Sequence, residues 1–237
     1  LSLAKRIQQS LQKGSIQERL IALQGTVSNE TLQENATTFA KEWFNKALSN
    51  GLAMFQGNLR NIYIDEGDFN NARRVALTAA ELGNPTMMLY TGLDCHEHEK
   101  FEDAFTWFTK GAALGQAEST AELADYYYHF YDTKELRRLI PYNPVKAIGL
   151  YRRAATKHFS DAGYAALQAA FGYIFHIGHL PLDWGLIADL THMAATKERF
   201  MFSLPYIGYM RIHGLGVTKN IRFGVQSLTR VLDEEKR

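Results

Sequence analysis

Cysteine is nearly absent from this sequence, and its charges nearly cancel. Cys95 is the single cysteine among 237 residues, which excludes an intramolecular disulfide and is compatible with a reducing compartment. The 26 lysines and arginines are balanced by 25 aspartates and glutamates. Such a balance provides no overall attraction to nucleic acid or to anionic membranes.

The motifs of common enzyme classes are absent as well. The sequence contains no G-x-S-x-G, H-E-x-x-H or protein-kinase signature. Gly214 and Gly216 begin a partial dinucleotide-loop pattern, but Lys219 occupies the place of the third glycine and no strand-like segment precedes it. We therefore predict a protein without enzymatic activity and without a cofactor.

Charge is missing from one long stretch, which lies between Asp161 and Asp183. Its length would suit a membrane-spanning helix. Polar residues and a proline interrupt it, namely Gln168, His176, His179 and Pro181. We therefore predict no membrane span, and we expect a helix that neighbouring helices bury.

A repeating helical pattern is present instead. In three segments a small residue precedes an aromatic or apolar pair by three positions, and further small residues follow. These segments begin at Ala40, Ala72 and Ala104, at equal intervals of 32 residues, and looser copies begin at Ala147, Ile187 and Gly224. Glycines follow the first three segments at the same interval, at Gly51, Gly83 and Gly115. Because a glycine just beyond a helix suits the left-handed C′ position, each segment is predicted to be a helix.

Each of these helices is predicted to pair with the helix that precedes it. Small residues at helical spacing allow the two helices to approach closely, and aromatic side chains fill the remaining gaps. We expect Trp107 to lie in such a core, where its truncation to alanine would cost about 3 to 5 kcal/mol. The glycines at Gly214 and Gly216 then form the turn between two helices rather than a phosphate loop.

The last copy resembles the Sel-one-like repeats, a branch of the tetratricopeptide-type α-solenoids. Its matching residues are Ile207, Gly208, Gly214, Gly216, Val217 and Gly224. Less complete matches are Phe171, Gly172, Phe175 and Gly178, and Leu123, Ala124 and Tyr127. The resemblance implies an all-α fold, a right-handed α-solenoid of about five to six antiparallel helix pairs. It implies one domain over residues 1–237, with capping helices in 1–37, repeats in 38–232 and a tail in 233–237.

A solenoid of helix pairs offers an extended concave surface and no enclosed reaction pocket. We therefore expect a scaffold or adaptor for protein–protein interaction, as a component or assembly factor of a larger complex. The first helix of each pair would line the surface, with Tyr127, Tyr173 and Tyr209 as candidate contacts. The alternative is an RNA-binding repeat protein of an organelle, which would require a repeated polar pair that the sequence does not show.

The interval between Ala104 and Ala147 is longer than the earlier ones, and the extra residues include Pro141 and Pro144. Insertions in repeat proteins emerge as loops, often on the binding face. This insertion and the helix after it are rich in positive charge, chiefly from Lys134, Arg137, Arg138, Arg152 and Arg153. We predict that these residues bind an acidic segment of a protein partner or an RNA backbone. The alternative is a solvated loop whose arginines pair with neighbouring repeats.

The segment from Asp94 to Glu99 combines histidines, carboxylates and Cys95, the residue types that bind metals. No second cysteine is available to complete a tight zinc site. We therefore expect a solvated turn between helices and no bound metal, and we rank a metal-binding or enzymatic function below the scaffold.

Residues 1–17 contain no acidic residue, and place Leu3, Ile7 and Leu11 on one helical face. This pattern is typical of mitochondrial transit peptides, and also of a helix that caps a solenoid. We expect an intracellular protein, mitochondrial or cytoplasmic. Two glycosylation sequons, at Asn29 and Asn35, are weak support for the endoplasmic reticulum. Because the chain begins at Leu1 rather than methionine, we expect that a segment precedes it.

Overall fold

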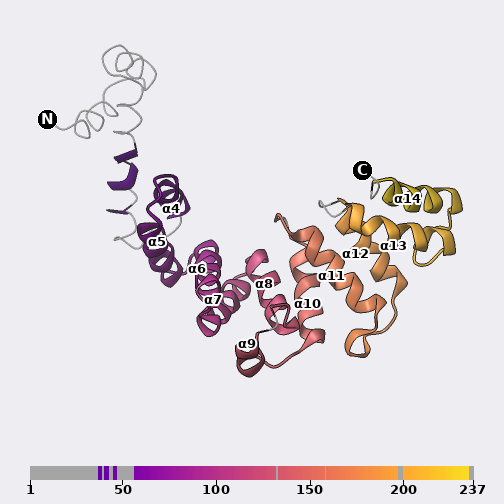
Figure 1. The fold of residues 1–237 in the computed structure, drawn as a ribbon, viewed down its shortest axis with the longest axis horizontal. Coiled ribbons are helices and arrows are strands. Elements are labelled where there is room, and N and C mark those ends of the chain that lie inside the picture. The colour runs from indigo at the N-terminus through magenta and orange to yellow at the C-terminus, as the bar shows by residue number, and fades with distance from the viewer. Residues whose placement is uncertain are drawn as a thin grey trace, which may run out of the picture. The chain divides into compact units, whose positions relative to one another are not determined.

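The computed structural model describes residues 37, 38, 40–42, 45, 46, 56–131, 133–157, 159–196 and 200–234. Within these ranges all regular structure is helical, so the all-α prediction is confirmed (Figure 1). Residues 1–87 and 88–237 form two compact units, and each is described by itself. The N-terminal features noted above, including residues 1–17, both sequons and Gly51, lie outside the described residues.

The helices follow one another as a series of pairs, as expected of an α-solenoid. The first unit contains α4 (Gln56–Asp65) and α5 (Phe69–Glu81), which pack together, and α6 (Pro85–Glu97) spans the boundary between the units. The second unit continues with α7 (Phe101–Ala113), α8 (Ala117–Tyr128), α9 (Lys134–Leu139), α10 (Pro144–Ala155), α11 (Ala162–Ile174), the 3₁₀ turn η2 (Ile177–His179), α12 (Trp184–Thr196), α13 (Phe200–His213) and α14 (Ile221–Glu234). Helix α8 pairs with α10, α11 with α12, and α13 with α14.

Local sequence signals set the ends of these helices. Side chains of Asp68, Asn143 and Asn220 each accept a hydrogen bond from the amide three residues later, which caps α5, α10 and α14. Pro144 stands in the first turn of α10, where a proline is tolerated, so it starts a helix and does not break one. Gly83 and Gly115 follow α5 and α7 with φ of 93° and 82°, which confirms the predicted left-handed positions.

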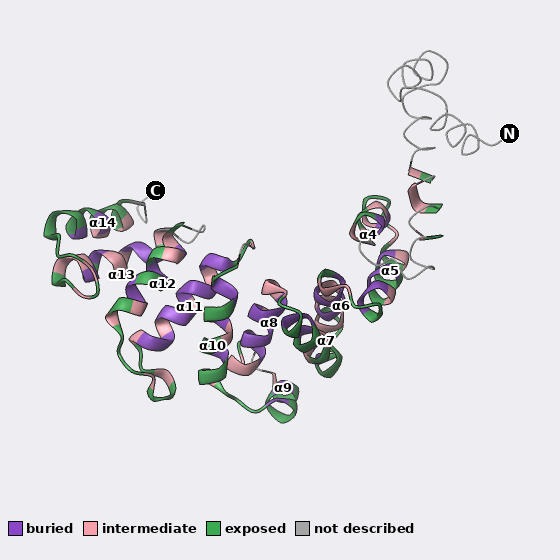
Figure 2. Cartoon of the chain, turned by 180° about the vertical axis from the view of Figure 1, so that it is seen from behind, coloured by how far each residue is buried: buried purple, intermediate pink, exposed green. Residues whose placement is uncertain are grey.

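The predicted insertion is a short helix and not an open loop. Thr133 caps α9 by accepting a hydrogen bond from the Leu136 amide at 3.1 Å. Leu136 and Ile140 are buried in the same cluster as Phe108 and Tyr126. The rest of α9 faces solvent, as its mostly exposed surface in Figure 2 shows. Two apolar anchors therefore hold the inserted residues against the second unit.

Of the pair Trp107 and Phe108, only Phe108 enters the core, whereas the sequence predicted that Trp107 would. Phe108 is fully buried, and its ring lies 5.5 Å from that of Tyr126, whereas Trp107 is only half-buried beneath the ammonium group of Lys110. In the next pair Tyr151 is likewise buried. The prediction that Trp107 fills the core is wrong by one residue, which corresponds to about 100° around a helix.

The charge-free stretch forms α11, the most deeply buried helix of the second unit, followed by η2. Nine of its thirteen residues are buried, among them Ala165, Ala166 and Ala169, because small side chains admit close neighbours. None of the described helices is long and apolar enough to cross a membrane.

The Gly214–Gly216 segment is a tight turn between α13 and α14. Both glycines have positive φ, 72° and 64°, and a Cβ atom at Gly216 would collide with the backbone carbonyl of Trp184. The turn therefore packs against the start of α12, which excludes the phosphate-loop interpretation.

Gly216→Ala should lower the free energy of unfolding by more than about 2 kcal/mol. This loss is about twice the one expected from a strained φ alone. Gly115→Ala is the matched control, because Gly115 also has positive φ but has open space where its Cβ would stand. Urea denaturation of both variants measures the difference. Equal losses would show that the contact with Trp184 does not constrain the turn.

Candidate partner-binding surface

An open groove lies between the exposed sides of α10 and α12. Its volume is about 600 Å³. Each helix contributes residues at positions i, i+3, i+4 and i+7, which form one helical face. These residues are Gly149, Arg152, Arg153 and Thr156 from α10, and Leu186, Asp189, Leu190 and Met193 from α12. The groove therefore has two arginines on one wall and mainly apolar side chains on the other.

Hydrogen bonds to neutral acceptors orient both arginines. Arg152 Nη1 donates to the hydroxyl oxygen of Tyr173 on α11 at 3.1 Å. Arg153 Nη2 donates to the carbonyl oxygen of Ala112 at 3.3 Å and to Thr120 Oγ1 at 3.4 Å. Neither arginine forms an ion pair with a carboxylate within the described part of the chain, and both remain exposed. The groove thus keeps two positive charges in fixed places.

The other predicted basic residues lie elsewhere. Lys134, Arg137 and Arg138 are exposed on α9, which packs on α7 and does not line the groove. The structure therefore separates the five predicted cations into an α9 surface and the α10–α12 groove.

The three predicted tyrosines also occupy different environments. Tyr127 is partly buried, and its hydroxyl oxygen accepts a hydrogen bond from Lys146 Nζ at 2.7 Å. Tyr173 is 8% exposed, so it supports Arg152 from below and offers little surface of its own. Tyr209 is 52% exposed and stacks against His213.

A smaller cavity of about 220 Å³ lies on the other side of α12, against α13 and the Gly216 turn. Asp189 lines both the cavity and the groove, and Met210 and Arg211 line the cavity from α13. Pockets for cofactors and drug-sized ligands measure about 300 to 1,000 Å³. This cavity is therefore large enough for one side chain of a partner rather than for a cofactor.

A cluster of tyrosines and carboxylates links α8, α10 and α11. The Asp125 carboxylate on α8 accepts hydrogen bonds from the hydroxyls of Tyr151 on α10 and Tyr164 on α11, the second at 3.2 Å. Asp125 is buried, and this burial raises its pKa to about 6, although both hydroxyls oppose the rise.

Glu122 lies one helical turn before Asp125. Its carboxylate accepts a hydrogen bond from the Tyr131 hydroxyl at 3.1 Å. Burial, and secondarily the charge of Asp125, raise the pKa of Glu122 to about 7. This buried pair was not predicted from the sequence. The spacing of Glu122 and Asp125 on an otherwise Ala- and Tyr-rich helix was the available signal.

The Asp94–Glu99 segment was predicted to be a solvated turn, but part of it packs against aromatic side chains. His96 stacks on Tyr131 with ring centroids 4.2 Å apart, and its Nδ1 lies 2.7 Å from the Tyr126 hydroxyl. Burial lowers the pKa of His96 and raises that of Cys95. In the described ranges, no three histidine, cysteine or acidic side chains come together as a metal-binding group.

Paired helices and their glycine turns together define a helical-repeat protein. The family model of the Sel1 repeat matches residues 33–52, 76–116, 117–158 and 206–226, just over half of the chain. The protein belongs to the Sel1 repeat family, whose members are generally scaffolds for protein–protein interaction.

Solved structures show the same fold. A Sel1 repeat protein from Oxalobacter formigenes is 18% identical with a TM-score of 0.62, over 83% of this chain and 56% of that chain. A protective antigen present in uropathogenic Escherichia coli strains, which displays an SLR fold, is 18% identical with a TM-score of 0.67, over 99% of this chain and 49% of that one. The chain thus spans about half the length of these proteins. A comparison with curated proteins gave no match.

Proposed function

We propose that the protein is a non-enzymatic scaffold whose α10–α12 groove binds an acidic segment of a partner protein. The observation that supports this most directly is the pair of exposed arginines, Arg152 and Arg153, beside a partly exposed apolar wall that contains Leu186 and Met193. Carboxylates of the partner would pair with the guanidinium groups, and its apolar side chains would cover the wall.

The arginines are suited to this role because they are already oriented. Their hydrogen bonds to Tyr173, Ala112 and Thr120 restrict the side chains before a partner arrives. Less side-chain entropy is then lost on binding. A partner segment that crosses Asp189 would also reach the 220 Å³ cavity, where one of its apolar side chains could enter.

We also propose the kind of complex and the compartment in which the scaffold works. A groove of this size suits a short segment of a larger complex, so we propose a component or assembly factor of a multi-subunit assembly. The basic, amphipathic residues 1–17 support a mitochondrial location over the cytoplasm or the endoplasmic reticulum.

Reversing both groove charges in R152E/R153E should weaken partner binding at least tenfold, which corresponds to about 1.4 kcal/mol. Tagged wild-type and variant proteins would be recovered from the native extract, and the partner that co-purifies would be identified and titrated. K134E/R138E changes the net charge equally on α9 and should bind as wild type. R152Q/R153Q removes both charges but keeps amide donors beside Tyr173. Circular dichroism of each variant establishes that the fold is intact.

The salt dependence of binding tests the same contacts. The wild-type affinity should decrease as the salt concentration is raised from about 0.05 to about 0.5 M, and the affinity of R152E/R153E should decrease less. Equal affinity of wild type and R152E/R153E would place the partner elsewhere. Loss of the partner after ribonuclease treatment would favour the RNA-binding alternative.

A further inference from the structure

Exposed apolar side chains gather at two turns of the second unit. The exposed residues in and after α9 and on either side of η2 are Leu139, Tyr142, Val145, Phe175 and Leu182. The two turns meet, because a Cβ atom at Gly178 would collide with the side chain of Val145. Figure 1 shows α9 and the turn after α11 along the same lower edge of the ribbon. These residues therefore belong to one surface.

The backbone of the α9 insertion is held in place, so its side chains have set positions. Leu136 and Ile140 are buried and fix α9 against the second unit. The amide of Asn143 donates a hydrogen bond to the carbonyl oxygen of Tyr127 on α8 at 2.9 Å. Tyr142, next to this hydrogen bond, is nevertheless 55% exposed. The insertion thus presents an aromatic ring to solvent from a fixed backbone.

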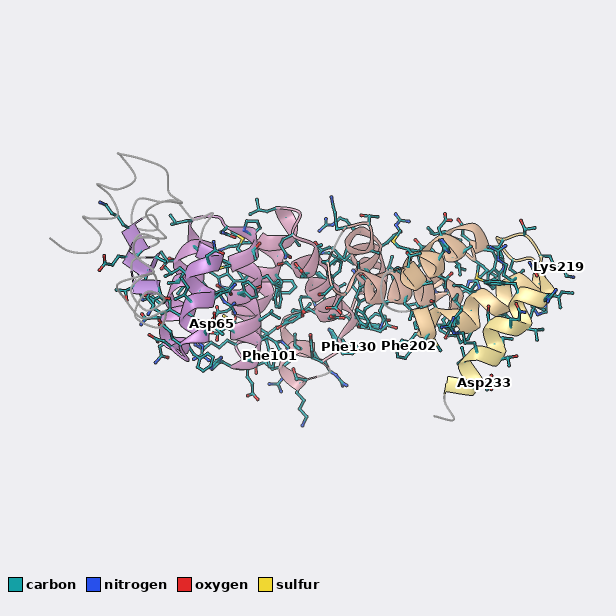
Figure 3. All side chains as sticks on the ribbon, turned by 90° about the horizontal axis from the view of Figure 1, so that it is seen from above. Asp65, Phe101, Phe130, Phe202, Lys219 and Asp233 are labelled. Carbon is teal, nitrogen blue, oxygen red and sulfur yellow. The ribbon has the colours of Figure 1, made fainter. Side chains whose placement is uncertain are left out.

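Positive charge surrounds these apolar side chains, although the whole chain is nearly neutral. The exposed cations of the insertion and of the first turn of α10 are Lys134, Arg137, Arg138 and Lys146. Glu135 is the only acidic residue between positions 133 and 146. Lys146 Nζ lies 4.1 Å from the centroid of the Tyr127 ring, which is neutral and leaves the positive charge uncompensated. Phe130, labelled in Figure 3, is also exposed just ahead of this segment.

We propose that this surface attaches the protein to the face of an anionic membrane. We call it the turn edge, and its members are Lys134, Arg137, Arg138, Leu139, Tyr142, Val145, Lys146, Phe175 and Leu182. Lysine and arginine are attracted to anionic lipid headgroups, and exposed aromatic and aliphatic side chains enter the boundary between headgroups and acyl chains. Because the turn edge has both kinds of residue side by side, it binds such a surface peripherally and reversibly.

The aliphatic members of the turn edge favour a membrane over an RNA partner. An RNA backbone would pair with the cations, but Leu139, Val145 and Leu182 offer it neither hydrogen bonds nor rings for stacking. The ring of Tyr142 already lies 5.4 Å from that of His129, which limits its stacking with a base. A lipid surface presents phosphate groups directly above an apolar layer, so it can use the cations and the aliphatic side chains together.

The turn edge shares no residue with the α10–α12 groove, so this proposal does not depend on the proposed function. Helix α10 carries parts of both surfaces, because Lys146 stands in its first turn and Arg152 in its last. The six residues between these positions correspond to a rise of about 9 Å along the helix. A protein segment in the groove and a lipid surface at the turn edge could therefore be bound at the same time.

Co-sedimentation with phosphatidylcholine vesicles, prepared with and without phosphatidylserine, tests the proposal. The wild-type protein should sediment with the anionic vesicles and stay in solution with the neutral ones. K134E/R138E should weaken binding to the anionic vesicles at least about tenfold, because it reverses two charges of the turn edge. R152E/R153E is the matched control, since it makes the same change of charge in the groove and should bind these vesicles nearly as well as the wild type.

The apolar members need a separate variant. L139S/Y142S leaves every charge unchanged and should weaken binding to the anionic vesicles about fivefold, because less apolar surface enters the headgroup boundary. L114S is the matched control, since Leu114 is also exposed but follows α7 and lies outside the turn edge. Circular dichroism establishes that each variant keeps its helical content.

Three results would overturn the proposal. The first is that the wild-type protein does not sediment with the anionic vesicles. The second is that K134E/R138E binds them as the wild type does. The third is that L139S/Y142S binds them unchanged, because the cations would then attract any anionic surface. Polyuridylate identifies the alternative: tighter binding to this RNA than to the vesicles, lost in K134E/R138E and kept in L139S/Y142S, would assign the cations to RNA.

Discussion

Truncating Phe108 to alanine should lower the free energy of unfolding by about 3 to 5 kcal/mol. Phe108 is fully buried, its ring meets Tyr126 edge to face, and it fills the space that Gly92 leaves on α6. Removing the ring would leave a cavity between three helices. Urea denaturation followed by circular dichroism measures the loss.

Trp107→Ala is the matched variant, and it should cost only about 1 kcal/mol. Its indole is half-buried, and its described contact is with Lys110 Nζ, which lies 4.3 Å from the ring centroid. Exposed cation–π contacts contribute about 0.5 to 1 kcal/mol. A larger loss for Trp107→Ala than for Phe108→Ala would reverse the assignment of the core face of α7.

The stability of the second unit should fall as the pH rises from about 4 to 8. The folded state raises the pKa of Asp125 to about 6 and that of Glu122 to about 7, from ordinary values of 3.8 and 4.5. The folded chain therefore holds these two protons more tightly than the unfolded chain. This contribution is complete below about pH 4 and is lost as the pH passes through the raised values.

The size of the effect follows from the shift. Two pKa units correspond to about 3 kcal/mol, so ionising Asp125 inside the cluster should cost the folded state roughly that amount. His96 acts in the opposite direction, because burial lowers its pKa, so its protonation at low pH opposes folding. Asp161 also contributes a negative charge near both carboxylates.

The double variant E122Q/D125N isolates the two carboxylates from these other groups. Both amide side chains retain an oxygen that accepts from Tyr131 or Tyr151, so the packing of α8 is preserved. Urea denaturation at pH 4.5, 6 and 8 should give a smaller pH dependence for this variant than for the wild type. Parallel pH curves for the two proteins would show that the cluster does not titrate in this range.

Much of the fold could be predicted from local sequence signals. Gly83 and Gly115 occupy the left-handed positions that their spacing indicated, and the charge-free stretch became the buried helix α11. These predictions succeeded because a helix end depends on the backbone freedom of one glycine, and burial depends on the composition of one segment.

The candidate site was less accessible to sequence reasoning. Arg152 and Arg153 were predicted from the sequence as binding residues, but the apolar wall at Leu186 and Met193 comes from a different repeat. Likewise, nothing in the neighbourhood of Asp125 shows that hydroxyls from α10 and α11 meet its carboxylate. Such sites combine residues from helices that are distant in the sequence. Whether these residues come into contact depends on how the helix pairs stack.

By itself, then, the sequence determined the helices, their turns and the repeat family of this protein. Tertiary structure alone decided that Phe108 rather than Trp107 enters the core, that Tyr173 supports Arg152 from below, and that Val225 remains exposed. The physical reason is the range of the interactions. Helix ends depend on contacts within about four residues, whereas the burial of a side chain depends on which face of its helix the neighbouring helices cover.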